Sequence, residues 1–129
     1  MKTKLALTIL GGYNTLMGLI MLAMPGEFAS QAVAEHVASD ANVLECFTLF
    51  HYGLSPALLM IGLTLLLIRK SAVETAKNAL LAYAIGTGVL ISLFFTVFSS
   101  AEIMNFSIEM AAPDILAFGL AIFAYLKGK

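Results

Sequence analysis

The sequence predicts an all-α integral membrane protein, an antiparallel four-helix bundle formed by a single domain over residues 1–129. Three observations lead to this fold class. Apolar residues make up 60% of the chain and charged residues only 12%, whereas soluble domains carry about twice that share of charge. A soluble chain this short could not bury so many apolar side chains. Four apolar stretches approach the ~20 helical residues that cross a bilayer, and the basic residues segregate with respect to them.

The predicted spans are bounded by helix-breaking or basic residues and cover residues 5–24, 44–68, 79–99 and 107–126. The first ends at Pro25-Gly26, a pair that terminates helices. Residues 28–41, between the first two spans, are alanine-rich but carry three charged or titratable side chains. For this segment we expect a short interfacial helix or an ordered loop.

Every lysine and arginine lies on one side of this four-span map. They precede the first span, separate the second from the third, and follow the fourth: Lys2, Lys4, Arg69, Lys70, Lys77, Lys127 and Lys129. Among the acidic residues, only Glu74 accompanies them. The positive-inside rule then predicts that both termini are cytoplasmic. A miscount of one span would destroy the pattern, so the segregation also supports the number four.

The same features predict a location and exclude some partners. Without a eukaryotic targeting element, the multi-pass topology indicates a bacterial inner membrane, with the lipid bilayer as the main partner and a membrane protein or a second copy as further candidates. A cleaved signal peptide is the alternative for residues 1–24, but the Gly11–Asn14 interruption and the lack of a small-residue cleavage site argue against it. No basic and aromatic stretch indicates nucleic acid.

Helices in lipid associate through small residues and interhelical hydrogen bonds. Each predicted span carries such residues at helical spacing. In chain order, these predicted packing faces are Gly11, Asn14, Thr15 and Gly18; Thr48, His51, Ser55 and Gly62; Gly88, Ser92, Thr96 and Ser99; and Ala117, Ala121 and Ala124. The opposite faces are large and apolar, as lipid contact requires. Short connections then favour an antiparallel bundle.

At ~1.5 Å of rise per residue, polar groups from all four spans fall at the midplane or in the outer half of the bundle. They form a predicted ligand-binding pocket of Asn14, His51, Tyr52, Ser55, Ser92, Thr96 and Asp114. Asp114 is its first candidate, because a carboxylate at membrane depth costs about 2.5–3.5 kcal/mol and normally has a partner. His51 is the proposed partner, in a proton-exchanging couple or a metal or ligand site. The alternative makes Pro113 the first helical residue and Asp114 an interfacial residue stabilised by the helix dipole.

The proline within the second predicted span, Pro56, is a further indication of a pocket. Pro56 lacks an N–H, so the carbonyl of Tyr52 loses its usual helical partner, and such kinks often border cavities in membrane proteins. The alternatives are a kink that only shapes the bundle and a His51 that is merely a satisfied hydrogen-bonding group. For Asn14, interhelical bonding is the competing role.

Motifs of soluble enzymes are absent, so no catalytic residue, metal ligand or cofactor is assigned. Cys46 is the single cysteine, and no CxxC or Cys/His spacing suggests a metal site. Nor does the chain contain a phosphate-binding glycine loop, a GxSxG elbow or an HExxH helix.

The layout resembles the DoxX-like group of small bacterial four-helix membrane proteins. The features that carry the resemblance are a first helix ending in Met21-Leu22-Ala23-Met24-Pro25, an amphipathic outer connection, and a second helix with Tyr52-Gly53 and Gly62 that ends in basic residues. The resemblance implies a four-helix membrane fold, and some members of the group are associated with membrane redox enzymes and quinones.

Three functions remain open from the sequence. The first is a non-catalytic accessory or small-ligand-binding bundle, which the lack of a catalytic constellation favours. The second is a quinone- or metal-associated component of a membrane oxidoreductase. The third is a small proton-coupled transporter, although four-helix multidrug transporters need a glutamate within the first helix, where this chain has only Asn14.

Overall fold

The computed structural model describes residues 1–129 and is helical throughout, which confirms the predicted all-α class. Its elements are α1 (Thr3–Ala23), α2 (Pro25–Ala32), the 3-10 helix η1 (Glu35–Val37), α3 (Ala41–Ile68), α4 (Val73–Thr96), the 3-10 helix η2 (Phe98–Ser100) and α5 (Ile108–Lys127). Four of them, α1, α3, α4 and α5, are long and apolar enough to cross a membrane. Each coincides with one predicted span. Helix α4 begins six residues before the predicted residue 79, because its first turns are polar and were therefore not counted as part of an apolar span.

Local chemistry explains where the outer elements begin. Pro25 separates α1 from α2 and is the first residue of α2, a position where its missing N–H costs no helical hydrogen bond. Asp40 caps α3, because its carboxylate accepts hydrogen bonds from the backbone N–H groups of Asn42 and Val43. Between these points, α2 and η1 occupy the segment for which a short helix or ordered loop was expected.

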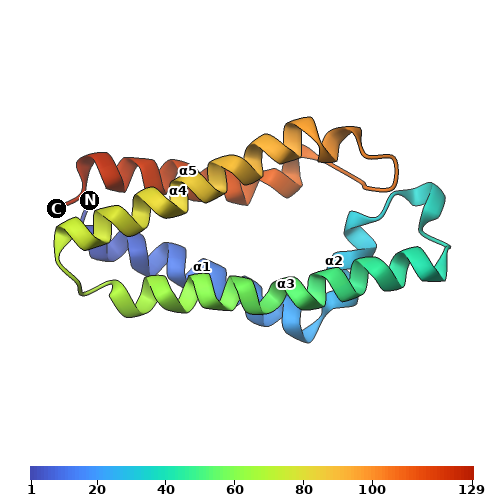
Figure 1. Ribbon diagram of the computed structural model, residues 1–129, viewed down its shortest axis with the longest axis horizontal. Coiled ribbons are helices and arrows are strands. Elements are labelled where there is room, and N and C mark those ends of the chain that lie inside the picture. The colour runs from blue at the N-terminus through green and yellow to red at the C-terminus, as the bar shows by residue number, and fades with distance from the viewer.

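The long helices lie side by side and alternate in direction along the chain (Figure 1). Close contacts join α1 to α3 and α4 to α5, and α1 also contacts both α4 and α5, so that it connects the two pairs. Both termini lie at one end of the molecule (Figure 1). Backbone hydrogen bonds tie them together there, from Thr3 N to the Lys129 carbonyl at 3.1 Å and from Lys129 N to the Met1 carbonyl at 3.2 Å.

Glycines bring α1 and α3 into direct backbone contact. A Cβ atom added to Gly18 would lie 2.9 Å from the backbone nitrogen of Leu59, and one added to Gly11 would lie 2.9 Å from the Gly62 carbonyl oxygen. Such an approach leaves no room for a side chain. The small residues predicted to pack the first two spans therefore do so at Gly11, Gly18, Ser55 and Gly62, all of which are buried.

Alanines and leucines form the contact between α4 and α5. The buried cluster also includes three residues of α1 and one of α3, and from α4 and α5 it contains Ala76, Leu80, Ala84, Ala117, Ala121 and Ala124. The predicted α5 face is confirmed. The predicted α4 face is confirmed only at Gly88, where an added Cβ would lie 3.2 Å from the ring of Phe118, whereas Ser92, Thr96 and Ser99 are exposed. Each of these three hydroxyls donates to a backbone carbonyl of α4 four residues earlier, so none of them needs an interhelical partner.

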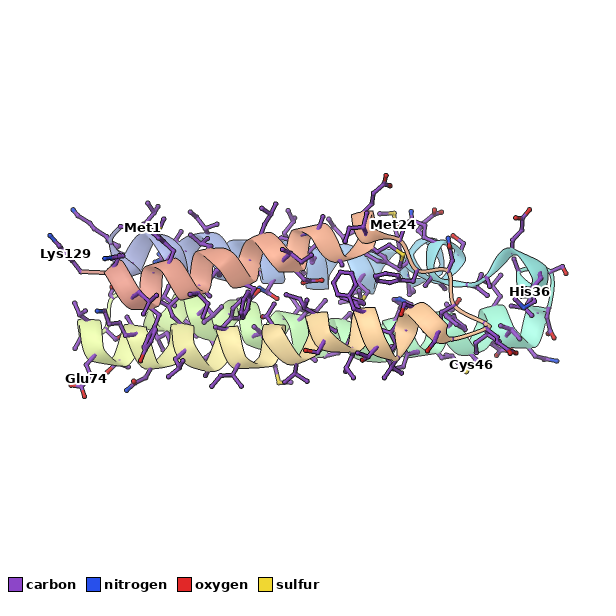
Figure 2. The ribbon with its side chains drawn as sticks, turned by 90° about the horizontal axis from the view of Figure 1, so that it is seen from above. Met1, Met24, His36, Cys46, Glu74 and Lys129 are labelled. Carbon is purple, nitrogen blue, oxygen red and sulfur yellow. The ribbon has the colours of Figure 1, made fainter.

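Two hydrogen bonds join the connections at the other end of the molecule. The backbone N–H of Ala34 donates to the Ile103 carbonyl, and that of Asn105 donates to the Ala32 carbonyl, each at 2.8 Å. His36 and Cys46 lie at this end, whereas Met1, Glu74 and Lys129 lie at the opposite one (Figure 2). Because the basic residues belong to the termini, the α3–α4 turn and the start of α4, the positive charge gathers at a single end.

Candidate functional site

A hydrogen bond between α1 and α4 marks the polar centre of the molecule. Asn14 is buried, and its Nδ2 donates to the Leu10 carbonyl and to the hydroxyl of Tyr83, both at 2.9 Å. Asn14 lies eleven residues into α1 and Tyr83 ten residues into α4, so both are ~15–17 Å along their helices. The interhelical role considered for Asn14 is thus present in the structure.

Asp114 lies on the inner face of α5. It falls three residues after Ala111 and three before Ala117, both of which are buried, and this spacing keeps all three on one helix face. The carboxylate is half-buried, forms no hydrogen bond or ion pair within the chain, and lies within electrostatic range of Tyr13 and Tyr83. We call Tyr13, Asn14, Tyr83 and Asp114 the polar cluster.

The helix boundary at Asp114 decides between the two sequence interpretations. Helix α5 begins at Ile108, and Pro113 lies inside it. The interpretation in which Pro113 is the first helical residue is therefore wrong. The apolar and alanine-rich residues before the proline extend the helix outward, and this places Asp114 more than a turn inside it.

An apolar groove of about 290 Å³ runs between α1 and α5 next to the polar cluster. Its lining residues are Ile9, Leu10, Tyr13, Pro113, Leu116, Ala117 and Leu120. The side chains of Ile9 and Leu116 are 46% and 74% exposed, so the groove opens on the outer apolar surface. Tyr13 belongs to both features and joins the groove to the polar cluster.

The structure does not join His51 to Asp114. Nδ1 of His51 lies 2.7 Å from the Phe47 carbonyl oxygen, one turn back in α3, which requires the proton on Nδ1. The imidazole packs against Phe28 of α2, with ring centroids 6.2 Å apart, and edge-on against Phe50 at 5.8 Å. No hydrogen bond or ion pair connects it to α5.

Ser55 satisfies the carbonyl that Pro56 leaves without an N–H. Its hydroxyl donates to the Tyr52 carbonyl oxygen at 2.7 Å, while the Tyr52 side chain itself is exposed. The proline in α3 thus creates no free hydrogen-bonding group. Of the predicted pocket residues, the structure brings Asn14 and Asp114 near Tyr83. No side-chain hydrogen bond or ion pair joins the others to Asn14 or Asp114: His51, Tyr52, Ser55, Ser92 and Thr96.

Tyr13 and Tyr83 were not among the site residues predicted from the sequence. A signal was available, because tyrosine in membrane proteins concentrates at the interfaces, whereas these two lie near the middle of apolar helices. A buried tyrosine hydroxyl usually has a partner, so a mid-helix tyrosine points to nearby polar groups. No three His, Cys, Asp or Glu side chains lie together as a metal site would need.

Comparisons with protein-family models, with curated proteins and with solved structures find no match. The features of this chain that point to a function are therefore the polar cluster and the groove beside it.

Proposed function

We propose that this protein is a non-catalytic, small-ligand-binding or accessory protein of the bacterial inner membrane, whose ligand occupies the α1–α5 groove against the polar cluster. One observation carries the proposal, namely the half-buried carboxylate of Asp114 without a partner in the chain. At membrane depth such a group costs about 2.5–3.5 kcal/mol and normally faces a partner or a functional cavity. The adjoining groove offers the space for that partner.

The proposed setting is an antiparallel bundle of the DoxX-like type with both termini in the cytoplasm. Supporting this orientation, the lysines and arginines gather at the end that holds the termini, as the positive-inside rule expects. Large apolar side chains cover the outer faces of the long helices; Leu67, for example, is 82% exposed and Leu116 74%. Lipid is the solvent in which these faces are stable.

The hydroxyl groups favour a second candidate, a quinone-associated component of a membrane oxidoreductase. Tyr83 accepts a hydrogen bond from Asn14, which leaves its own proton available, and Tyr13 lines the groove. Quinone carbonyl oxygens accept hydrogen bonds, and the Tyr13 hydroxyl is the donor that lines the groove, whereas Tyr83 is not one of the lining residues. This candidate and the first share the same groove but differ in the ligand.

Blocking the groove tests whether it binds a ligand. Leu116→Trp adds bulk at an exposed lining position, and Leu67→Trp makes the same change on an exposed face of α3 outside the groove. Thermal unfolding of the protein in maltoside micelles would be measured with and without each of four probes. Three are single-chain amphiphiles that differ in charge, dodecyltrimethylammonium, dodecanol and dodecyl phosphate, and the fourth is a decyl-substituted benzoquinone.

We expect at least one probe to raise the unfolding midpoint of the wild type and of Leu67→Trp but not of Leu116→Trp. Binding to the folded state alone stabilises it in proportion to the logarithm of ligand concentration. If no probe distinguishes the two tryptophan variants, the groove is not a ligand site and the proposal fails.

A further inference from the structure

We infer the chemical class of the ligand: an organic cation with one apolar chain, its charged head between Tyr13 and Asp114 and its chain in the α1–α5 groove. The inference rests on the proposed function. It follows from the juxtaposition of the unpaired Asp114 carboxylate, the ring of Tyr13, which lines the groove, and the apolar groove itself, which is open to the outer surface.

The chain itself supplies no cation to Asp114. Along α5 the nearest basic residue is Lys127, thirteen residues away, or ~20 Å of helix, and the remaining lysines and arginines lie at that same end. His51 is held by the Phe47 carbonyl and packs against α2. In surroundings of low dielectric constant a single charge acts strongly on any cation brought close to it. A cationic ligand is thus the complement that the site lacks.

Two tyrosines within electrostatic range of Asp114 favour an organic cation over a metal ion. Tyr13 lines the groove, and both Tyr13 and Tyr83 lie within electrostatic range of the carboxylate. Aromatic faces attract ammonium groups through the ring quadrupole, and cages of this kind recognise quaternary ammonium ligands. A divalent metal ion would instead need several oxygen or nitrogen ligands, whereas no group of three acidic, histidine or cysteine side chains is present.

The groove also limits the apolar part of the ligand. Six of its seven lining residues are hydrophobic, and its volume of about 290 Å³ lies just below the usual range for small-molecule sites, roughly 300–1,000 Å³. One slender chain suits this space better than the two chains of a bilayer lipid. Entry is lateral, because Ile9 and Leu116 form the exposed edge.

Calorimetric titration in maltoside micelles tests the inference with the full-length chain. The probe is dodecyltrimethylammonium. Dodecanol and the decyl-substituted benzoquinone are its neutral counterparts, and dodecyl phosphate is its anionic one. We expect the cation to bind at least about tenfold more tightly than either neutral probe, which corresponds to about 1.4 kcal/mol. Asp114→Asn should remove that preference, whereas Glu109→Gln, a matched change at an exposed position of α5, should leave it intact.

A second pair of variants reports on the aromatic contact. Tyr13→Phe keeps the ring face and should change cation affinity by less than about threefold, while Tyr13→Leu should weaken it by roughly fivefold or more. These variants keep the test valid if Asp114→Asn does not fold.

The outcomes separate this inference from the proposed function. If a neutral or anionic probe binds as tightly as the cation, with an affinity that depends on Leu116 but not on Asp114, the groove is a ligand site and the cationic class is wrong. If Leu116→Trp alters the binding of no probe, both proposals are wrong.

Discussion

Replacing Gly62 by alanine is expected to separate α1 from α3. A Cβ atom at this position would meet the hydroxyl and the backbone nitrogen of Thr15 and would lie 2.8 Å from the Gly11 carbonyl oxygen. Ordinary van der Waals contact starts near 3.4 Å. Two of the three obstructing atoms belong to the α1 backbone, so no side-chain rotation relieves the overlap and α1 must move away.

The size of the effect follows from two opposing terms. Overpacking a tight interface costs typically 1–3 kcal/mol, while alanine gains up to about 1 kcal/mol over glycine in helix propensity. Gly119 provides the matched control, because it follows Pro113 by six residues as Gly62 follows Pro56, and a Cβ there would meet nothing within 4 Å. Gly119→Ala therefore keeps the propensity gain without the clash, and the two variants should differ by about 2 kcal/mol.

Equilibrium unfolding by dodecyl sulfate in mixed micelles, followed by far-UV circular dichroism, measures this difference. The wild type should fall between Gly119→Ala, which is more stable, and Gly62→Ala, which is less stable. Equal stability of the two alanine variants would refute the argument, because it would mean that the backbone contact between α1 and α3 does not exist in the folded protein.

Three further predictions follow from individual contacts. Ser55→Ala removes the hydroxyl that donates to the Tyr52 carbonyl, which Pro56 leaves without an N–H partner, and should lower the free energy of unfolding by about 1–3 kcal/mol. Ser92→Ala, at an exposed position, should change the free energy of unfolding by less than about 0.5 kcal/mol. Equal losses in the two variants would contradict the role given to Ser55. Tyr83→Phe should lose about 1 kcal/mol through its bond to α1, and an unchanged midpoint would refute that bond. The membrane orientation is testable by cysteine labelling: exposed Cys46 should react with an impermeant maleimide added outside the cell. In a Cys46→Ser background, Lys70→Cys should react only after the membrane is permeabilised. Labelling of both cysteines without permeabilisation would overturn the orientation.

The helices were predictable because crossing a membrane is a property of composition and length. Hydropathy and the positions of the lysines located four spans, and the structure has four helices that satisfy the same requirement. Their contacts were predictable only in part. A glycine such as Gly62 in an apolar helix points to close approach of another helix backbone. A serine is ambiguous, because its hydroxyl can bond across to another helix or, as at Ser92, to its own helix. The spacing of residues in the sequence does not distinguish these two uses of a serine.

The candidate site was also only partly predictable from the sequence. Counting residues estimates height along a helix but not the direction in which a side chain points. His51 and Asp114 were paired because their heights were similar, yet His51 packs against Phe28 on α2 and Asp114 lies on the inner face of α5. The tyrosines near Asp114 were overlooked because, apart from His51, only small and short polar residues were considered for the packing faces, and neither Tyr13 nor Tyr83 belongs to those types.

The position of the groove within the packing bears on how a ligand could enter. Glycine contacts hold α1 against α3, and alanine contacts hold α4 against α5, whereas α1 meets α5 less extensively, and it is there that the groove lies. A ligand that occupies the groove without widening the space between α1 and α5 would leave both close-packed pairs intact, together with the buried cluster that α1 shares with α4 and α5. Asp114 and Tyr13 stand on opposite sides of this boundary, on α5 and α1, and a cation bound to both would join the two helix pairs. Binding should then stabilise the whole molecule and not one pair alone, which is why global unfolding is a suitable measure of occupancy.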